Sequence, residues 1–239
     1  MMNLRWMPNI LTMGNLTCGF MSVIFASFNS SEGYVVAAVL ILVAALLDGL
    51  DGQVARWLGV SSPIGKELDS LADSVAFGVA PGYLAYVTYL AGTSIVLLDR
   101  SIDLGVPIAA IFPVCAAYRL ARFNVQSSPD SFTGLPSPIA GMLVALALIC
   151  FRNVEIPKPL FAITFSLVGF LMVSTVRYSK PKPPFILKYL HGFKLSGLVV
   201  LLVLLLLLFK FWVIFLFIGL YILSGLLTFV INFIEDHRY

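Results

Sequence analysis

Long apolar stretches dominate the chain, and short polar, glycine or proline segments separate them. A membrane-spanning helix needs about 20 mostly apolar residues, and eight stretches reach or approach that length. The pattern therefore predicts an all-α fold, a polytopic membrane helical bundle with about eight transmembrane helices. The predicted spans are residues 10–29, 33–56, 67–91, 104–124, 136–152, 159–177, 194–209 and 212–234.

The C-terminal part of the chain differs from the rest in its charge pattern. Residues 195–234 are uncharged except for Lys210, which lies near the middle and marks a turn between two helices. A basic, proline-containing segment precedes them. We therefore expect a membrane domain with a six-helix core over residues 1–180, followed over residues 181–239 by a basic cytoplasmic connector and a helical hairpin.

Composition agrees with a membrane protein. The chain has 239 residues, of which 60% are hydrophobic and 11% charged, whereas soluble domains carry about 45 to 50% apolar and about 25% charged residues. This excludes a soluble domain with a charged surface, and we expect no nucleic-acid partner. The three cysteines lie in or beside apolar stretches without paired spacing, which indicates buried, inert thiols.

Lysine and arginine positions predict the orientation in the membrane. Positively charged loops stay in the cytoplasm. With the N terminus inside, eleven of the fifteen lysines and arginines fall in cytoplasmic segments and four outside. We therefore expect a multi-pass protein of the cell membrane.

Acidic residues cluster in one short part of the chain. Only twelve are present, yet five fall within residues 48–73, among apolar and small side chains. Carboxylates inside spanning segments usually mark an ion, proton or substrate site. Asp48 and Asp51 are three apart and Asp69 and Asp73 four apart, so each pair shares a helix face.

A short loop joins the two helices that carry these pairs, so they are expected to run antiparallel with the four carboxylates facing one another. Such a group requires bound cations or protonation of some members. Oxygen ligands favour Mg²⁺ or Mn²⁺. Four carboxylates suit two divalent cations about 3.5 to 4 Å apart, the arrangement used in phosphoryl chemistry. Glycines between the acids indicate close approach by a ligand, or else ordinary helix packing.

The acidic segment resembles the signature of the CDP-alcohol phosphatidyltransferase family. The resemblance rests on Asp48-Gly-Leu-Asp51-Gly52-Gln-Val-Ala55-Arg56, eight further residues, and Gly65-Lys-Glu-Leu-Asp69-Ser-Leu-Ala-Asp73. It implies that Asp48, Asp51, Asp69 and Asp73 bind divalent metal and that Asp73 is also the general base. It further implies that Gly52, Ala55, Arg56 and Gly65 bind the CDP-lipid, that no other cofactor is needed and that the protein is a homodimer.

Four outer stretches are similar to the membrane-type phosphatidylserine synthases of this family, and residues 8 to about 180 carry the resemblance. It implies transfer of a phosphatidyl group from CDP-diacylglycerol, a membrane lipid, to L-serine at the cytoplasmic face. The stretches are PNILTMGNLTCG from Pro8, AFGVAP from Ala76, YRLARFN from Tyr118 and FTGLPSP from Phe132.

Three further groups of residues have two readings each. Asn9, Thr12 and Asn15 recur at helical spacing, and they either face the cytidine or pyrophosphate or form interhelical hydrogen bonds. Arg119 and Arg122 either bind the acceptor and lipid phosphate or anchor the helix at the interface. Ser137 either helps to hold the acceptor or belongs to an ordinary turn.

Other functions remain as alternatives. A sibling enzyme would use glycerol 3-phosphate or inositol phosphate and would need further cationic residues for the acceptor's phosphate. An ion-coupled transporter would place its acids near the membrane midplane, whereas these lie towards one interface. A structural subunit leaves the four aspartates unexplained. The histidine-based route of phospholipase D-like enzymes requires paired HxK motifs, and this chain has only two histidines.

Overall fold

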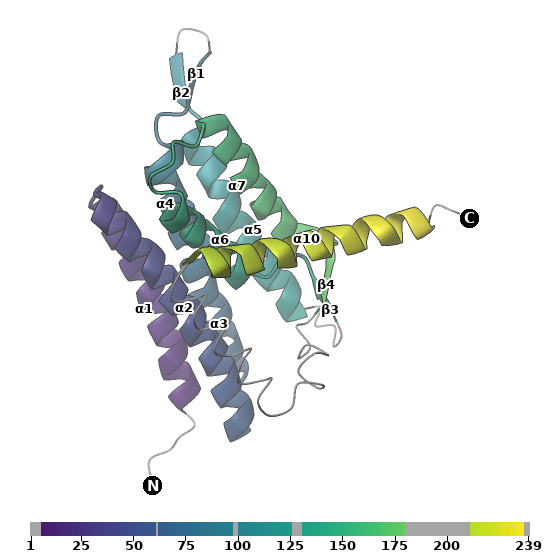
Figure 1. The fold of residues 1–239 in the computed structure, drawn as a ribbon. Coiled ribbons are helices and arrows are strands. Elements are labelled where there is room, and N and C mark those ends of the chain that lie inside the picture. The colour runs from purple at the N-terminus through teal and green to yellow at the C-terminus, as the bar shows by residue number, and fades with distance from the viewer. Residues whose placement is uncertain (1–5, 61, 98–99, 126–130, 180–210, 237–239) are drawn as a thin grey trace, which may run out of the picture.

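The computed structural model describes residues 6–60, 62–97, 100–125, 131–179 and 211–236, and helices make up most of this part of the chain (Figure 1). Two turns of π-helix, η2 (Val75–Val79) and η3 (Tyr86–Leu90), lie within the helical stretches. The α-helices are α1 (Met7–Ser27), α2 (Ser31–Leu58), α3 (Pro63–Ser74), α4 (Ala80–Ala85), α5 (Gly105–Val125), α6 (Ser137–Cys150), α7 (Lys158–Val173) and α10 (Phe211–Asp236).

The turn between α2 and α3 is encoded locally. Gly59 ends α2 with a φ of 63°, a left-handed conformation that glycine adopts without steric cost. Ser62 begins the next helix, where its hydroxyl accepts a hydrogen bond from the Gly65 N–H at 2.9 Å, and Pro63 occupies the first turn. The chain thereby reverses direction between the two helices that carry the acidic pairs.

A single helical run extends from α3 to η3 without interruption. α3, η2, α4 and η3 follow one another over residues 63–90, so the run starts before the predicted span 67–91 and ends close to it. η2 begins two residues after Asp73. π-Helical turns inside longer helices are frequent at functional sites, and this one lies directly beside the acidic segment.

Helix α1 packs against both helices that carry the acidic pairs, α2 and α3. It packs along α2 and also against α3 and η2, while α2 contacts η2 and α4. The approach is close at Gly19, where an added Cβ would lie 2.6 Å from the Cα of Ala76. Small residues allow helices in membranes to approach in this way. Apolar side chains of α5, α6, α7 and α10 form a second core, and α6 also contributes Ala145 and Leu148 to the core around α1 and α2.

Two short antiparallel ribbons depart from the all-α prediction. β1 (Ser94–Leu97) pairs with β2 (Arg100–Asp103), and β3 (Ser131–Thr133) pairs with β4 (Arg177–Ser179). β-Branched residues favour strands, and β1 contains Ile95 and Val96 in a segment between helices. The second ribbon ties the chain after α5 to the chain after α7.

The predicted count of eight spanning helices is not confirmed. In the described part of the chain, α1, α2, α5 and residues Phe211–Val230 of α10 are long and apolar enough to cross a membrane. α6 and α7 are apolar but have only 14 and 16 residues, fewer than the roughly 20 that a perpendicular span needs. The run 63–90 starts with the polar helix α3. The predicted span 194–209 and most of the basic connector lie outside the described residues.

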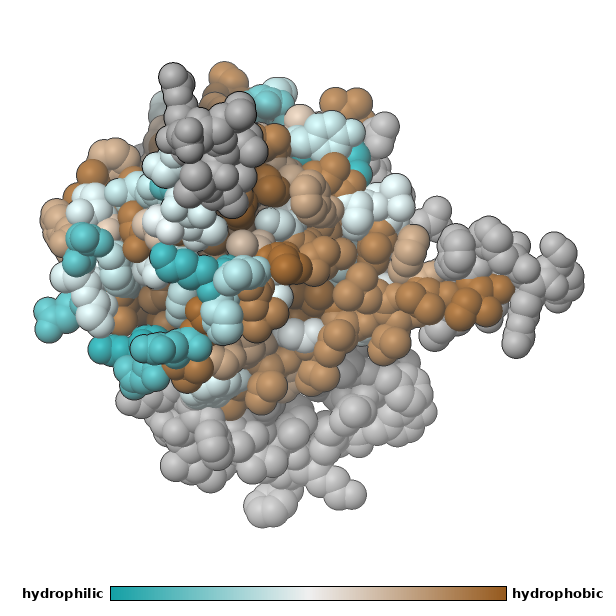
Figure 2. All heavy atoms as spheres, turned by 90° about the horizontal axis from the view of Figure 1, so that it is seen from above, coloured by the Kyte–Doolittle hydropathy of each residue, from teal (hydrophilic) through white to brown (hydrophobic). Residues whose placement is uncertain are grey.

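The exposed surface of α10 is apolar. In Figure 1 this helix lies across α6 and extends beyond the bundle, and the view from above in Figure 2 shows brown, hydrophobic side chains along it. Leu216, Leu220, Leu223 and Leu227 are all more than half exposed. Such a surface is suited to lipid rather than to water, so the structure agrees with a membrane protein.

Candidate active site

The acidic side chains meet where α2 and α3 approach α1. One carboxylate oxygen from each of Asp48, Asp51 and Asp69 lies within 4.8 Å of the other two. Asp73, one turn after Asp69, interacts electrostatically with Asp48 and Asp69. Asp51 and Asp73 are buried and Asp48 and Asp69 partly buried. The structure thus brings together four carboxyl groups that are up to 25 positions apart in the sequence.

The geometry of this group fits divalent cations. Three oxygens from separate carboxylates within 4.8 Å of one another form a suitable ligand set for a hard ion. One further observation agrees with a bound cation: Oδ1 of Asp69 is buried and has no hydrogen-bond partner among the described residues. Buried acceptors normally have a partner, and a cation between the helices would satisfy this oxygen.

Two polar side chains of α1 contact the acids. The Thr12 hydroxyl lies 2.8 Å from Oδ2 of Asp51 and 3.0 Å from the Pro8 carbonyl, and its single proton can serve one of them at a time. The Asn15 amide donates to Oδ1 of Asp73 at 3.0 Å. Both residues are buried. They therefore form interhelical hydrogen bonds, one of the two readings that their spacing allowed.

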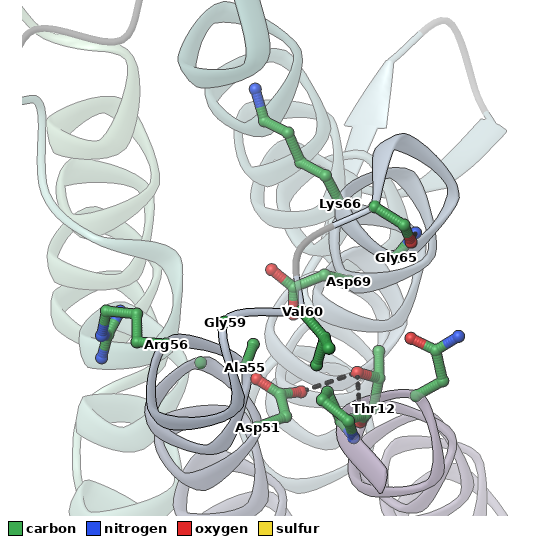
Figure 3. Close-up of a pocket in the computed structure, with 13 residues that line it drawn as sticks. Thr12, Asp51, Ala55, Arg56, Gly59, Val60, Gly65, Lys66 and Asp69 are labelled. Atoms are coloured by element: carbon green, nitrogen blue, oxygen red, sulfur yellow. Dashed lines mark hydrogen bonds between the residues drawn. The ribbon is translucent and has the colours of Figure 1, made fainter. Parts of the chain in front are cut away.

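A cavity of about 550 Å³ opens beside the acids, between α1, α2 and α3. Asp51 and Asp69 line it, and so do all the residues that the family resemblance assigns to the CDP-lipid: Gly52, Ala55, Arg56 and Gly65. Asn9 and Thr12 line it from α1, whereas Asn15 is buried deeper. Figure 3 shows Asp51, Asp69 and Thr12 around the interior, with Arg56 and Lys66 extending away from the two acids.

Glycines leave space in this cavity. A Cβ at Gly52 would meet only the end of the Arg56 side chain, so the wall there is open, and a larger side chain would occupy the cavity. At Gly65 a Cβ would lie 3.0 Å from the Ser62 hydroxyl oxygen and 3.3 Å from the Asn9 side-chain oxygen. The cavity combines glycine walls, cationic side chains at its edge and carboxylates at its base, a combination suited to a phosphate-bearing ligand with metal ions.

Arg119 and Arg122 have different environments although both lie on α5. Arg119 is 7% exposed; its Nη1 donates to the Ser137 hydroxyl at 2.8 Å, and its guanidinium interacts electrostatically with Asp73 and Asp48. Arg122 donates to the carbonyl of Val173, the last residue of α7, and to the carbonyl of Thr133 in β3, both at 2.8 Å. Arg119, hydrogen-bonded to Ser137, therefore lies near the acids, and the contacts of Arg122 are those of a helix-capping residue.

One residue near the site has no signal in the sequence. Tyr221 of α10 interacts electrostatically with Arg119, but it lies in a nearly uninterrupted apolar stretch without motif or polar periodicity. Only the packing of α10 against α6 and β4 brings it there.

Fold and site together define a class: a helical membrane protein with a cluster of aspartates beside a cavity suited to a phosphate-bearing ligand. The sequence model of the CDP-alcohol phosphatidyltransferase family matches residues 5–178. The chain belongs to this family, as its aspartate signature predicted.

Similar proteins of known name come from bacteria and archaea, and each of three is called CDP-diacylglycerol–serine O-phosphatidyltransferase. The Helicobacter pylori (strain 26695) protein is 36% identical over 92% of this chain and 89% of its own length. The Bacillus subtilis protein is 32% identical over 73% of this chain and 90% of its own length. The Methanocaldococcus jannaschii protein is 35% identical, with coverage of 71% and 72% respectively.

Proposed function

We propose that this protein transfers the phosphatidyl group of CDP-diacylglycerol to L-serine, giving phosphatidylserine and CMP. The observation that carries the proposal is the meeting of Asp48, Asp51 and Asp69 within 4.8 Å beside the glycine-walled cavity, in a chain that belongs to the CDP-alcohol phosphatidyltransferase family. The names of its relatives support serine as the acceptor.

In the proposed reaction the serine hydroxyl attacks the phosphorus that carries the diacylglycerol. Asp73 takes the hydroxyl proton, a new P–O bond forms to serine, and the P–O bond to the CMP phosphate breaks, so CMP leaves. Asn15 holds Oδ1 of Asp73, which directs the other carboxyl oxygen towards the substrate. This direct displacement should invert the configuration at phosphorus.

Asp48, Asp51, Asp69 and Asp73 would hold two divalent cations, Mg²⁺ or Mn²⁺, and these would compensate the charge of the diphosphate and of the leaving group. Gly52, Ala55, Arg56 and Gly65 would receive the cytidine diphosphate from α2 and α3, with Asn9 and Thr12 on the opposite wall. Thr12 also holds Asp51, so it would couple the ligand wall to the metal ligands.

Arg119 is the proposed partner of the serine carboxylate. It is the buried cation beside Asp73, and Ser137 fixes its position. A carboxylate bound there would place an amino-acid acceptor next to the general base. Arg122, which the sequence also proposed for the acceptor or lipid phosphate, would act indirectly, by holding the end of α7 against β3.

We further propose that the protein is a multi-pass protein of the cell membrane with the site at its cytoplasmic face, where serine and CMP are dissolved. The bias of lysine and arginine towards one set of loops supports this orientation. Homodimerisation remains a proposal from the family resemblance.

A purified enzyme assay tests the function. The protein in detergent or nanodiscs is given CDP-diacylglycerol, Mn²⁺ or Mg²⁺, and serine, glycerol 3-phosphate or inositol phosphate in turn. We expect CMP release and a phosphatidylserine product with serine alone, and loss of both after chelation by EDTA with recovery on adding the metal. CMP release only with a phosphorylated acceptor would overturn the serine assignment. CMP release in the absence of any acceptor and of both Mg²⁺ and Mn²⁺ would contradict the proposed metal-dependent transfer.

A further inference from the structure

The C-terminal helix α10 lies outside the region matched to the family, yet it reaches the neighbourhood of the acids. Its Tyr221 interacts electrostatically with Arg119, which in turn interacts with Asp73 and Asp48. The match to the family ends at residue 178. A part of the chain beyond the shared catalytic region therefore contributes a side chain to the surroundings of the site.

Close packing holds Tyr221 in this place. Its ring stacks on the ring of Tyr178 in β4, with a centroid distance of 5.4 Å and an interplanar angle of 29°. One turn further along α10, Gly225 faces the same ring, and a Cβ at this position would overlap it. The contact between α10 and β4 beside Tyr221 thus depends on glycine at residue 225.

Arg119 has an unused donor in this buried environment. Nη1 donates to Ser137, whereas Nε is fully buried and has no hydrogen-bond partner among the residues that the structure describes. Nε and Nη2 form one edge of a guanidinium, and their spacing matches the two oxygens of a carboxylate. Because a buried donor without a partner is unfavourable, this edge is suited to an acceptor from outside the described part of the chain.

Tyr178 carries a second unpaired group. Its side chain is 1% exposed, and within the described part of the chain its hydroxyl has no hydrogen-bond partner. Burial, together with the neighbouring Tyr221, raises the pKa of Tyr178 to about 12, so the hydroxyl keeps its proton and remains a donor. Nε of Arg119 and the Tyr178 hydroxyl are thus two buried donors near Tyr221, which stacks on Tyr178 and interacts electrostatically with Arg119.

We infer that the carboxylate of the amino-acid acceptor binds the Nε edge of Arg119 and that Tyr221 of α10 closes this position, so that the C-terminal helix takes part in acceptor selection. This inference rests on the proposed function, and it assigns a binding position to the substrate's carboxylate and a role in acceptor binding to helix α10. With its carboxylate on Arg119, the acceptor would present its hydroxyl towards Asp73, because the guanidinium of Arg119 lies close enough to Asp73 for the two charges to interact.

Acceptors with and without a carboxylate, given to the wild-type protein, test whether the acceptor carboxylate binds Arg119. L-serine, L-serinamide and ethanolamine are compared by kcat/KM for CMP release. Loss of a charge-assisted pair should lower kcat/KM by about tenfold or more for the two acceptors without a carboxylate. In Arg119→Lys, which keeps the charge but not the two-donor edge, the difference between serine and serinamide should shrink. Equal use of serine and serinamide by the wild type would overturn the carboxylate assignment.

Tyr221→Phe tests whether Tyr221 of α10 takes part in acceptor binding, because this substitution removes one hydroxyl and keeps the ring stacked on Tyr178. We expect the KM for serine to rise about threefold or more with the KM for CDP-diacylglycerol unchanged. Tyr118→Phe is the matched control: Tyr118 precedes Arg119 on α5 but is 56% exposed, and its loss should leave both KM values unchanged. Thermal unfolding in detergent verifies that both variants are folded.

Each outcome has one meaning. If Tyr221→Phe and Tyr118→Phe have the same KM for serine, α10 has no part in acceptor selection. If Tyr221→Phe changes the KM for CDP-diacylglycerol instead, the helix serves the lipid substrate and the inference is wrong. If the wild type releases no CMP with any acceptor, the proposed function itself fails, which is distinct from failure of this inference.

Discussion

At the scale of residues, the site depends on how buried carboxyl groups are held. Asp51 is 5% exposed and Asp73 is 6% exposed, and each accepts a hydrogen bond from a side chain of α1, Thr12 and Asn15 respectively. A buried charge is stable only if it is paired or hydrogen-bonded. The neutral donors of α1 fix one oxygen of each acid and leave the remaining oxygens for cations and substrate.

Replacement of Asp73 by asparagine separates its proposed role as general base from its contribution to the shape of the site. Asp73→Asn keeps the shape of the side chain but cannot take a proton, so turnover should fall by about a hundredfold or more, the usual contribution of a general base, while CDP-diacylglycerol still binds. Asp48→Asn should instead raise the metal concentration needed for half-maximal activity.

CMP release and binding of CDP-lipid to the purified variants measure these effects. Glu67→Gln is the control, since Glu67 belongs to the same helix as Asp73 but is exposed. Near-normal turnover in Asp73→Asn would show that another group accepts the proton.

At the scale of elements, the close contact between α1 and η2 decides where Thr12 and Asn15 meet the acids. Gly19 lies one turn after Asn15, and its backbone approaches Ala76 directly after the acidic segment. Helices in a membrane gain most from such close packing. The position of the acids relative to α1 therefore depends on a residue without a side chain.

The variant Gly19→Ala tests this contact. The added methyl group would lie 2.6 Å from the Cα and 2.9 Å from the backbone nitrogen of Ala76, so α1 has to move outwards. We expect a loss of about 1 to 3 kcal/mol in the free energy of unfolding together with reduced turnover. Thermal unfolding in detergent and CMP release measure the two effects.

Gly219→Ala in α10 is the matched control, because a Cβ at that position has no neighbour within 4 Å in the part of the chain that the structure describes. It should leave stability equal or slightly raised, since alanine is a better helix former than glycine. A Gly19→Ala protein as stable and active as Gly219→Ala would disprove the importance of the close approach.

At the scale of the whole molecule, the arrangement serves a reaction between a lipid and water-soluble molecules. The long apolar helices place the chain in the bilayer, while the acids lie at one end of α2, next to the turn into α3. Cationic side chains gather at the same end, and Lys66 of α3 donates to the carbonyl of Asn124 at the end of α5. This distribution predicts which end of the bundle faces the cytoplasm.

Cysteine labelling in intact cells tests the orientation. Ile64, in the first turn of α3, is 77% exposed, and Val154, between α6 and α7, is 54% exposed. A membrane-impermeant maleimide should label Val154→Cys in intact cells and Ile64→Cys only after lysis. The wild type, with Cys18, Cys115 and Cys150 only partly accessible or buried, supplies the background. Labelling of Ile64→Cys in intact cells would show that the protein has the opposite orientation.

The local pattern of the sequence determined the membrane class, the family and the convergence of the acids. Spacing of three and four residues puts Asp48 with Asp51 and Asp69 with Asp73 on one helix face, and Gly59 with Ser62 encodes the turn that joins the two helices. These features depend on neighbours in the chain, so they can be read without knowing the packing. Seven of the predicted spans correspond in position to helical segments of the described chain, although not all of these are long enough to span a membrane.

Only the tertiary structure decided which distant side chains meet. It placed Thr12 and Asn15 on the acids, separated Arg119 from Arg122, formed the two small ribbons and brought Tyr221 to Arg119. The physical reason is that helices apolar on all sides carry little information about which face packs inwards. Their rotation and contacts are set by close packing at residues such as Gly19 and Gly225, and this fit exists only between elements that are already folded.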